Sequence, residues 1–242
     1  MQTVTRTVLV TGASSGIGRA VAVKLLTEGH NVIGLSRDIA RFKVTRENFS
    51  PEQFDLAQLK ELPQKAHDLA LRYPGLDAAV FCAGIGRFGS LEEFSYQQIQ
   101  ALMDINCISP VFLTRALLPF FKAKTRSDLI FIGSEAALKG SRKGAIYCAS
   151  KFALRGFTQA LREECSKDRV KICLINPGMV QTPFFDALSF TPGDDPTHHL
   201  VPDDIAEAVS YVINSRSEMV IDEINLNPLS KVVKPRNDSR NK

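Results

Sequence analysis

The sequence predicts a single-domain α/β protein, built on a Rossmann-type doubly wound parallel sheet with helices on both faces. Short β-branched runs alternate with helical patterns along the chain, and a glycine-rich turn joins the first run to the first helical pattern. The length of 242 residues suits one large domain with a sizeable core better than two domains. We expect residues 1–230 to form this domain and residues 231–242 to form a basic, disordered tail.

The first two strands and the helix between them indicate the sheet type. Residues 7–12 form a β-branched run and lead directly into residues 13–30, where apolar side chains recur at helical spacing: Ile17, Val21, Leu25 and Leu26. Residues 31–36 form the second run. Strand, helix and strand in this order make a βαβ unit, so we expect a parallel sheet.

The same alternation continues to the end of the domain. Helical patterns are expected at residues 59–72, 96–121, 145–164 and 203–215, and strands at residues 76–84, 128–134, 169–178 and 222–228. Residues 182–200 form a looser stretch between the last two of these strands. No repeat or linker divides the pattern.

Composition excludes several classes of partner. The formal net charge is +4, and residues 231–242 hold five basic side chains and one acid, so the rest of the chain is neutral and no nucleic-acid partner is expected. No apolar run approaches the roughly 18 residues that span a bilayer, and no targeting segment opens the sequence, so no membrane partner is expected. The five cysteines are odd in number and lack C-x-x-C spacing, which favours reduced thiols and a cytoplasmic location.

The glycine-rich turn lies at the carboxyl end of the first strand and opens the first helix. Glycines allow a tight turn and a close backbone approach, while the free N–H groups and the dipole of a helix N-terminus favour a pyrophosphate. A glycine-rich turn alone can be purely structural, but its place in the first βαβ unit favours a dinucleotide site. We expect contacts to the cofactor from Gly12, Ser14, Ser15, Gly16, Ile17 and Gly18.

The end of the second strand selects between the two nicotinamide dinucleotides. Ser36 and Arg37 stand there, and a small hydroxyl followed by a guanidinium suits the 2′-phosphate of NADP(H). Asp38 is adjacent and would favour the ribose hydroxyl of NAD(H) instead, so NAD(H) stays a possible cofactor. Further basic residues either add positive potential or are simply solvated: Arg41, Lys43 and Arg46.

Tyr147 and Lys151 are four residues apart in a helical pattern and therefore project from one helix face. A neighbouring ammonium favours the phenolate, so we expect the phenol to ionise more easily than its usual pKa of about 10 allows. Pro110 lacks an N–H four residues after Asn106, so the helix should kink there and leave the Asn106 carbonyl without its helical partner.

Several spaced motifs together resemble the short-chain dehydrogenase/reductase family, over residues 7–228. The segment from Thr11 to Gly18 is similar to its T-G-x-x-x-G-x-G turn, and the Asp55 position resembles its adenine-contacting acid. Residues 82–84 occupy the place of its N-A-G segment, and residues 176–182 resemble the segment that meets the nicotinamide. Four residues match its catalytic tetrad: Asn106, Ser134, Tyr147 and Lys151.

The resemblance implies an NADP(H)-dependent oxidoreductase that interconverts a carbonyl and an alcohol on a small molecule. Tyr147 would be the acid or base, Ser134 would orient the substrate oxygen, and Lys151 would bind the nicotinamide ribose. The Asn106 carbonyl would hold a water that links Lys151 to solvent. The resemblance also implies cofactor contacts from Asp55, Leu56, Cys82, Ala83, Gly84, Asn106, Tyr147, Lys151, Pro177, Gly178, Val180 and Thr182.

Other interpretations stay open. Ser134 would otherwise be a turn hydroxyl, and Asn106 a satisfied polar residue at a helix bend. An NAD-dependent alcohol dehydrogenase is the alternative enzyme, and a non-catalytic NADP-binding sensor or scaffold is the alternative of another class. Two residues depart from the family pattern: Cys82 removes an amide that would tie neighbouring strands together, and Glu135 follows Ser134 where a small residue is commoner.

Three variable segments are expected to select the substrate, namely the loop around Arg87 and Phe88, residues 136–145 and residues 182–200. Aromatic side chains would cover the substrate or pack in the core: Phe184, Phe185 and Phe190. Basic side chains suggest an anionic substrate group or a solvated loop: Lys139, Arg142 and Lys143. Residues 198–199 are adjacent histidines without a third ligand, so no metal is expected.

Two long helices, at residues 96–121 and 145–164, carry more than one apolar stripe. Their apolar side chains include Phe112, Leu117, Phe120, Phe121, Phe152, Leu154 and Phe157. Since these helices pair between subunits in the family, a homodimer or homotetramer is expected, with burial inside one monomer as the alternative.

Overall fold

The sheet of the computed structural model, which describes residues 4–42 and 46–236, is parallel throughout. Seven strands pair in the order β3-β2-β1-β4-β5-β6-β8, so β1 lies between β2 and β4. Their bounds are β1 Thr7–Thr11, β2 Asn31–Ser36, β3 Phe49–Gln53, β4 Leu76–Phe81, β5 Ser127–Ile132, β6 Val170–Pro177 and β8 Glu223–Leu226. The predicted doubly wound parallel sheet is confirmed.

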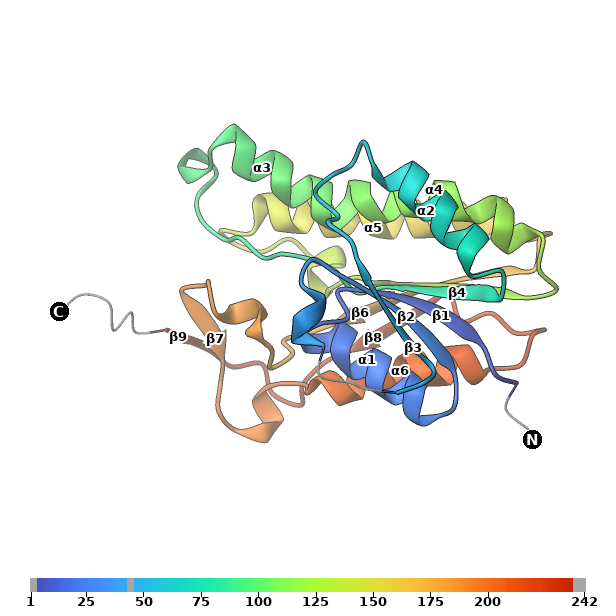
Figure 1. Ribbon diagram of the computed structural model, residues 1–242. Coiled ribbons are helices and arrows are strands. Elements are labelled where there is room, and N and C mark those ends of the chain that lie inside the picture. The colour runs from blue at the N-terminus through green and yellow to red at the C-terminus, as the bar shows by residue number, and fades with distance from the viewer. Residues whose placement is uncertain (1–3, 43–45, 237–242) are drawn as a thin grey trace.

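Helices cover both faces of this sheet (Figure 1). Helices α1 and α6 pack together on one face, while α2, α4 and α5 lie on the other, with α3 extending the α4 layer. Their bounds are α1 Gly16–Thr27, α2 Leu62–Arg72, α3 Tyr96–Met103, α4 Ser109–Lys122, α5 Ala145–Glu164 and α6 Pro202–Asn214. Each face therefore has its own apolar core, one centred on Leu117 and Phe131 and the other on Val21 and Val209.

The sequence analysis assigned no strand to residues 49–53, which form the edge strand β3. The segment FSPEQ is mostly polar and contains Pro51, which does not suit the pattern of a buried strand. Proline is tolerated in an edge strand because one side of that strand needs no sheet partner. Pro51 lies opposite Gly34 of β2, where the ring of Phe49 also packs close to the glycine.

The long helical pattern at residues 96–121 contains the predicted irregularity at the proline. Helix α3 passes through a π-helical turn, Asp104–Ile108, before α4 begins at Ser109. The widened turn falls immediately before Pro110, the residue that cannot donate the regular backbone hydrogen bond.

The prediction that no segment is long and apolar enough to cross a membrane is wrong for residues Tyr96–Lys122, which pass by length and composition. Their apolarity has a local cause, because α4 packs against α2 and the sheet. Leu113, Leu117 and Phe121 are buried there. Phe112 of α4 and Phe152 of α5 are more than a third exposed, so only part of the expected second apolar stripe is covered within the monomer.

The expected disordered tail is corrected for its described part. Residues Val233–Pro235 form strand β9, which pairs antiparallel with β7, Phe190–Pro192. The Arg236 side chain also donates to the Phe185 carbonyl at 2.7 Å. The basic segment is therefore packed against residues 185–192, which its composition alone does not reveal. Residues 237–242 lie outside the described residues.

A cluster of buried charges lies at the amino-terminal ends of the central strands. Asp128 of β5 is fully buried, and its Oδ2 accepts from Arg6 Nη1 at 2.9 Å and from Arg126 Nε at 3.0 Å. Lys171 of β6 places its ammonium 3.2 Å from Oδ1, at an angle that makes an ion pair but no hydrogen bond. Asp128 thus faces three cations, and Arg6 is compensated by a second carboxylate as well, since its Nε donates to Asp77 Oδ2 at 2.7 Å.

We expect Asp128→Asn to lower the free energy of unfolding by about 3–5 kcal/mol, because buried cations would lose their compensating charge. Urea denaturation measures the change. Glu61→Gln, which breaks the exposed pair with Lys65, is the control and should cost less than about 1 kcal/mol. Equal effects of the two substitutions would contradict the assigned importance of the buried cluster.

Candidate active site

A cavity of about 1250 Å³ opens at the carboxyl ends of the parallel strands. It is lined by the segments that follow the six strands β1 to β6, so residues far apart in the sequence meet at one edge of the sheet. In open α/β sheets this edge, at the point where the strand order reverses, is where ligands bind. Every predicted site residue except Asn106 lines the cavity.

The glycine turn has the backbone geometry that its sequence requires. Gly12 has φ +68° and Gly16 has φ +50°, values that residues with a side chain rarely adopt. A Cβ atom at Gly18 would collide with the Gly12 carbonyl, so the third glycine lets α1 approach the turn closely. Ser15, the N-cap of α1, makes no side-chain capping bond, and the first turn of the helix borders the cavity. Together these features suit an anionic ligand such as a pyrophosphate.

The corner at the end of β2 suits a phosphate better than a bare ribose. The Ser36 hydroxyl is buried and has no hydrogen-bond partner among the described residues, and Arg37 lines the cavity beside it. Asp38 is already engaged, since its carboxylate accepts from Ala40 N at 3.0 Å and pairs with Arg41 at 3.2 Å. A ligand phosphate would satisfy the orphaned hydroxyl and pair with the guanidinium.

The more distant basic residues do not reinforce this corner. Arg41 is held by Asp38, and Arg46 Nη1 donates to the Leu26 carbonyl at 3.5 Å. Lys43 lies outside the described residues. Arg37 is therefore the cation that the described structure offers to a 2′-phosphate.

The segment after β4 shows how the chain compensates for Cys82. Ala83 N donates to Thr11 Oγ1 at 3.1 Å, so a threonine hydroxyl ties β4 to the neighbouring β1. Cys82 packs against the core on the α1 side of the sheet, and burial raises the pKa of its thiol. Gly84 also lines the cavity. Asp55 and Leu56, which follow β3, line it as well.

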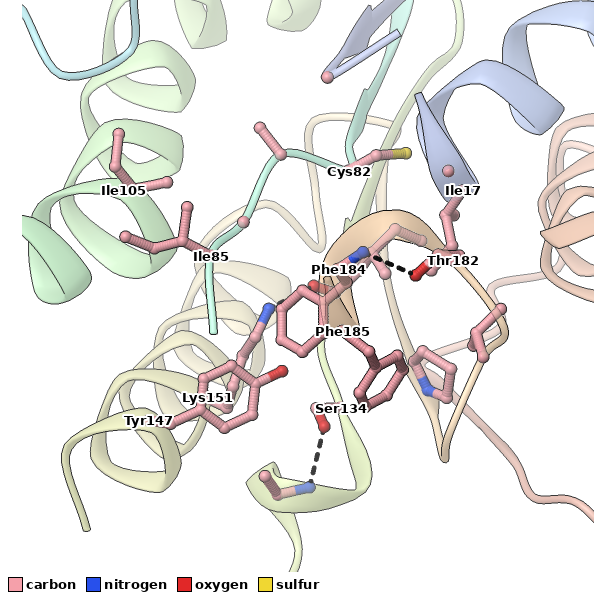
Figure 2. A pocket seen from close by; sticks show the side chains of 18 of the residues that line it. Ile17, Cys82, Ile85, Ile105, Ser134, Tyr147, Lys151, Thr182, Phe184 and Phe185 are labelled. Carbon is pink, nitrogen blue, oxygen red and sulfur yellow. Dashed lines mark hydrogen bonds between the residues drawn. The ribbon is translucent and has the colours of Figure 1, made fainter. Parts of the chain in front are cut away.

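Ser134 and Tyr147 meet inside the cavity (Figure 2). Ser134 Oγ accepts from Ala136 N at 3.1 Å, so this serine also caps a short helical turn, as its alternative interpretation expected. Asn176 Oδ1 accepts from Ser134 N at 3.3 Å and fixes the backbone there. Its amide nitrogen reaches Glu223 and Asn225 of β8, so Asn176 links three neighbouring strands at their carboxyl ends.

The expectation that Tyr147 ionises easily is wrong for this structure. Burial raises the pKa of Tyr147 to about 12, and the opposing hydrogen bond of Ser134 does not cancel it. Lys151 lies 5.9 Å from the centre of the phenol ring, while its Nζ donates to the Ile132 carbonyl at 3.0 Å. The ammonium is thus directed to the backbone of β5 and not to the phenolic oxygen.

Lys151 is 6% exposed, and burial lowers the pKa of its ammonium to about 8. Its other neighbours are the thiols of Cys82 and Cys107, which compensate a positive charge poorly. A lysine with a pKa this close to neutrality is suited to binding a ligand hydroxyl and to passing protons.

Asn106 lies behind the cavity wall and does not line it, which corrects its prediction as a direct cofactor contact. Its side chain accepts from Ile85 N at 2.8 Å and donates to the Ile85 carbonyl at 3.0 Å. A third bond, at 3.2 Å, reaches Ser150 Oγ on α5. The π-helical turn thereby clamps the loop after β4 to the helix that carries Tyr147 and Lys151.

An aromatic wall, formed by Phe88, Phe184, Phe185 and Phe190, stands over Tyr147. The ring of Phe88 lies 5.0 Å from that of Tyr147. The ring of Phe184, which Figure 2 shows beside Tyr147, lies 6.0 Å from it. Thr182 accepts from Phe184 N and sets the start of this segment. Gly86 lies beneath it, and a Cβ atom there would displace the Phe184 ring.

Sequence reasoning missed several residues that shape the site. Ile85, Met179 and Lys231 line the cavity, and Lys231 pairs with Glu135 at 2.6 Å. Lys231 lies in the segment assigned to the tail, so no local pattern could place it here. Gly133 carried a usable signal, since a glycine before a site serine suggests close packing, and a Cβ atom there would collide with Asn176. Among the described residues, no three histidine, cysteine or acidic side chains gather as a metal site.

Comparison with known proteins agrees with this geometry. The family model described as short chain dehydrogenase matches residues 6–191. The NADP-dependent 3-hydroxy acid dehydrogenase of Schizosaccharomyces pombe is 29% identical over 235 residues, covering 89% of this chain and 90% of that protein. The sepiapterin reductase of Chlorobaculum tepidum is 31% identical over 241 residues, covering 92% of this chain and 96% of that protein.

A solved structure is similar as well. A metagenomic short-chain oxidoreductase in complex with NADP has a TM-score of 0.79 at 29% identity, covering 93% of this chain and 98% of that chain. The sheet and its glycine turn define a dinucleotide-binding oxidoreductase fold. Within that class, the chain belongs to the short-chain dehydrogenase family.

The lowered pKa of Lys151 predicts a pH-dependent stability. The unfolded lysine has its usual pKa of 10.5 and the folded one a pKa of about 8, so between these values the unfolded state binds more protons and stability rises with pH. Relative to Lys151→Met, the wild type should gain up to ~3 kcal/mol between pH 8 and 10.5. Urea titrations of both proteins measure this, and the comparison cancels the similar effect of Lys171. A pH-independent difference would contradict the assignment.

Proposed function

We propose that this protein is an NADP(H)-dependent oxidoreductase that interconverts a carbonyl and an alcohol on a small molecule. The observation that carries the proposal is the convergence of Ser134, Tyr147 and Lys151 in one cavity that the glycine turn also lines. A positioned proton donor beside a dinucleotide site is what carbonyl reduction requires.

A nicotinamide held in this cavity would supply or accept the hydride, and the residues of the chain would orient the substrate oxygen and transfer its proton. Ser134 donates a hydrogen bond to the carbonyl oxygen and orients it. Tyr147 gives that oxygen its proton as negative charge develops. Burial keeps the phenol protonated at neutral pH, with a pKa of about 12, which suits a proton donor in the reducing direction.

Lys151 completes the proton path. Its pKa of about 8 allows the amine to exchange a proton near neutral pH, and its bond to the Ile132 carbonyl fixes its position. Asn106 acts indirectly, because its side chain holds Ile85 of the cavity lining and Ser150 of the helix that carries Tyr147 and Lys151. It is therefore a positioning residue in this proposal.

The cofactor part of the proposal rests on Ser36 and Arg37. The orphaned Ser36 hydroxyl and the adjacent guanidinium would bind the 2′-phosphate of NADP(H), and the engagement of Asp38 disfavours NAD(H). The NADP dependence named for the Schizosaccharomyces pombe relative supports the same choice. A non-catalytic sensor would not need the aromatic wall beside Tyr147, which encloses space for a substrate.

We also propose a homodimer or homotetramer assembled through α4 and α5. Phe112 and Phe152, one on each helix, are 36% and 43% exposed, and large aromatic side chains at the surface favour protein contacts. All five cysteines are free, four of them buried, which supports a reducing, cytoplasmic environment.

Replacing Tyr147 by phenylalanine should lower kcat for NADPH-dependent ketone reduction by about 100-fold or more, because the proton donor is removed. The dissociation constant for NADPH should stay within about twofold, since the cofactor site is left intact. Steady-state kinetics and calorimetric titration measure the two quantities. Tyr96→Phe, on a side chain that is 88% exposed, is the matched control, and near-normal turnover by the Tyr147 variant would refute the role.

Arg37→Ala should weaken NADPH binding by about 10- to 100-fold, the loss of a charge-assisted contact, and leave NADH binding nearly unchanged. Titration of the variant and the wild type with both cofactors measures the preference. Arg19→Ala removes an exposed arginine of α1 that does not line the cavity and serves as the control. An equal loss for both cofactors would place the guanidinium elsewhere than at the 2′-phosphate.

A further inference from the structure

The loop between β5 and α5 carries three cations on the substrate side of the cavity. Lys139, Arg142 and Lys143 all line the same cavity as Ser134 and Tyr147. All three lie in exposed positions at its mouth, and none makes an ion pair with another residue that the structure describes. Most exposed lysines and arginines are simply solvated, so the cluster alone would not indicate a ligand.

The acids near this loop do not neutralise it. Glu135 is paired with Lys231 at 2.6 Å, so its negative charge is already neutralised by a cation outside the loop. Glu93 also lines the cavity, but its Oε2 accepts from Ser90 N at 3.1 Å as part of a capping box. The substrate side of the cavity therefore keeps an excess of positive charge contributed by the loop.

The backbone of the loop holds Lys143 in an unfavourable conformation. Its φ is +60°, in the left-handed region that residues with a side chain rarely adopt. The Lys143 carbonyl accepts from Gly89 N at 2.8 Å, which ties the basic loop to the segment that carries Phe88. Strain retained in this way is common where a side chain has a function, and here glycine or asparagine would have been the relaxed choice.

The hydrogen bond between Lys143 and Gly89 also determines where the cations lie relative to the aromatic ring of Phe88 and to Tyr147. Phe88 is the neighbour of Gly89, and its ring contacts Tyr147, so the proton donor, an aromatic surface and a cationic rim follow one another. A ligand that reaches all three would have a carbonyl at Tyr147, an apolar middle against Phe88 and an anionic group at the rim.

We propose that Lys139, Arg142 and Lys143 bind an anionic group, a carboxylate or a phosphate, on the carbonyl substrate. This inference rests on the proposed carbonyl chemistry and adds a class of substrate to it. Guanidinium and ammonium donors form charge-assisted hydrogen bonds with either oxyanion. The loop would thus select among carbonyl compounds by their charge, while Ser134 and Tyr147 act on the carbonyl whatever its charge.

Matched pairs of substrates test the proposal. NADPH oxidation is followed with levulinate against methyl levulinate, and with dihydroxyacetone phosphate against dihydroxyacetone. The wild type should favour the anionic member of at least one pair by about 10-fold or more in kcat/KM, and the pair with the larger ratio identifies carboxylate or phosphate as the group. Equal kcat/KM values within both pairs would overturn the inference and leave carbonyl reduction standing.

Three variants test the residues. Lys139→Ala and Arg142→Ala should each raise KM for the preferred anion by about 10-fold without changing kcat or the KM of its neutral partner. Lys143→Gly should do the same and should also keep or raise the melting temperature, because glycine relaxes the positive φ. Lys60→Ala, an exposed lysine outside the cavity, is the control. Unchanged KM values in all three variants would overturn the proposal.

A binding measurement separates failure of this inference from failure of the proposed function. In the presence of NADP⁺, which cannot reduce a ketone, calorimetry should detect tighter binding of levulinate or dihydroxyacetone phosphate than of its neutral partner, and Arg142→Ala should remove the difference. If no carbonyl in the panel is reduced but this difference is found, the reaction assigned to Tyr147 fails and the anion site stands. If neither anion binds better than its neutral partner, the anion site is refuted.

Discussion

The pairing of β1 with both β2 and β4, all three parallel, is the constraint on which the rest of the molecule depends. It reverses the direction in which strands are added to the sheet and separates the two helix layers at that point. The segments that follow strands β1 to β6 then all line one cavity at the carboxyl ends of those strands. Without this arrangement, the glycine turn and the α5 helix would have no common space.

The buried amine of Lys151 is a place where the needs of the cavity conflict with the folding stability of the protein. Lys151 keeps its amine in a site that is almost closed to water and offers one carbonyl and two thiols as neighbours. The charged form is disfavoured there, and the core must compensate that cost. The hydrogen bond to the Ile132 carbonyl holds the amine in position, and the apolar clusters on both faces of the sheet supply the favourable burial that offsets the cost.

Local spacing in the sequence predicted the sheet and the glycine turn, and the family resemblance predicted most of the remaining site residues, which line the cavity. Neither predicted β3, whose polar residues are tolerated only at a sheet edge, or β9, whose partner is about forty residues away in the chain. The position of Asn106 behind the wall and the raised pKa of Tyr147 also depend on tertiary packing. Spacing shows which side chains share a helix face, but not how deeply the assembled protein buries them.

The pairing of β7 with β9 has a consequence for biosynthesis. Strands β1 to β6 are all translated before β9, so the nucleotide half of the sheet can assemble while the chain is still growing. The aromatic wall gains its partner strand only when residues 233–235 emerge from the ribosome. The order of translation therefore places the strands of the nucleotide half before the strand that pairs with the aromatic segment at Phe190.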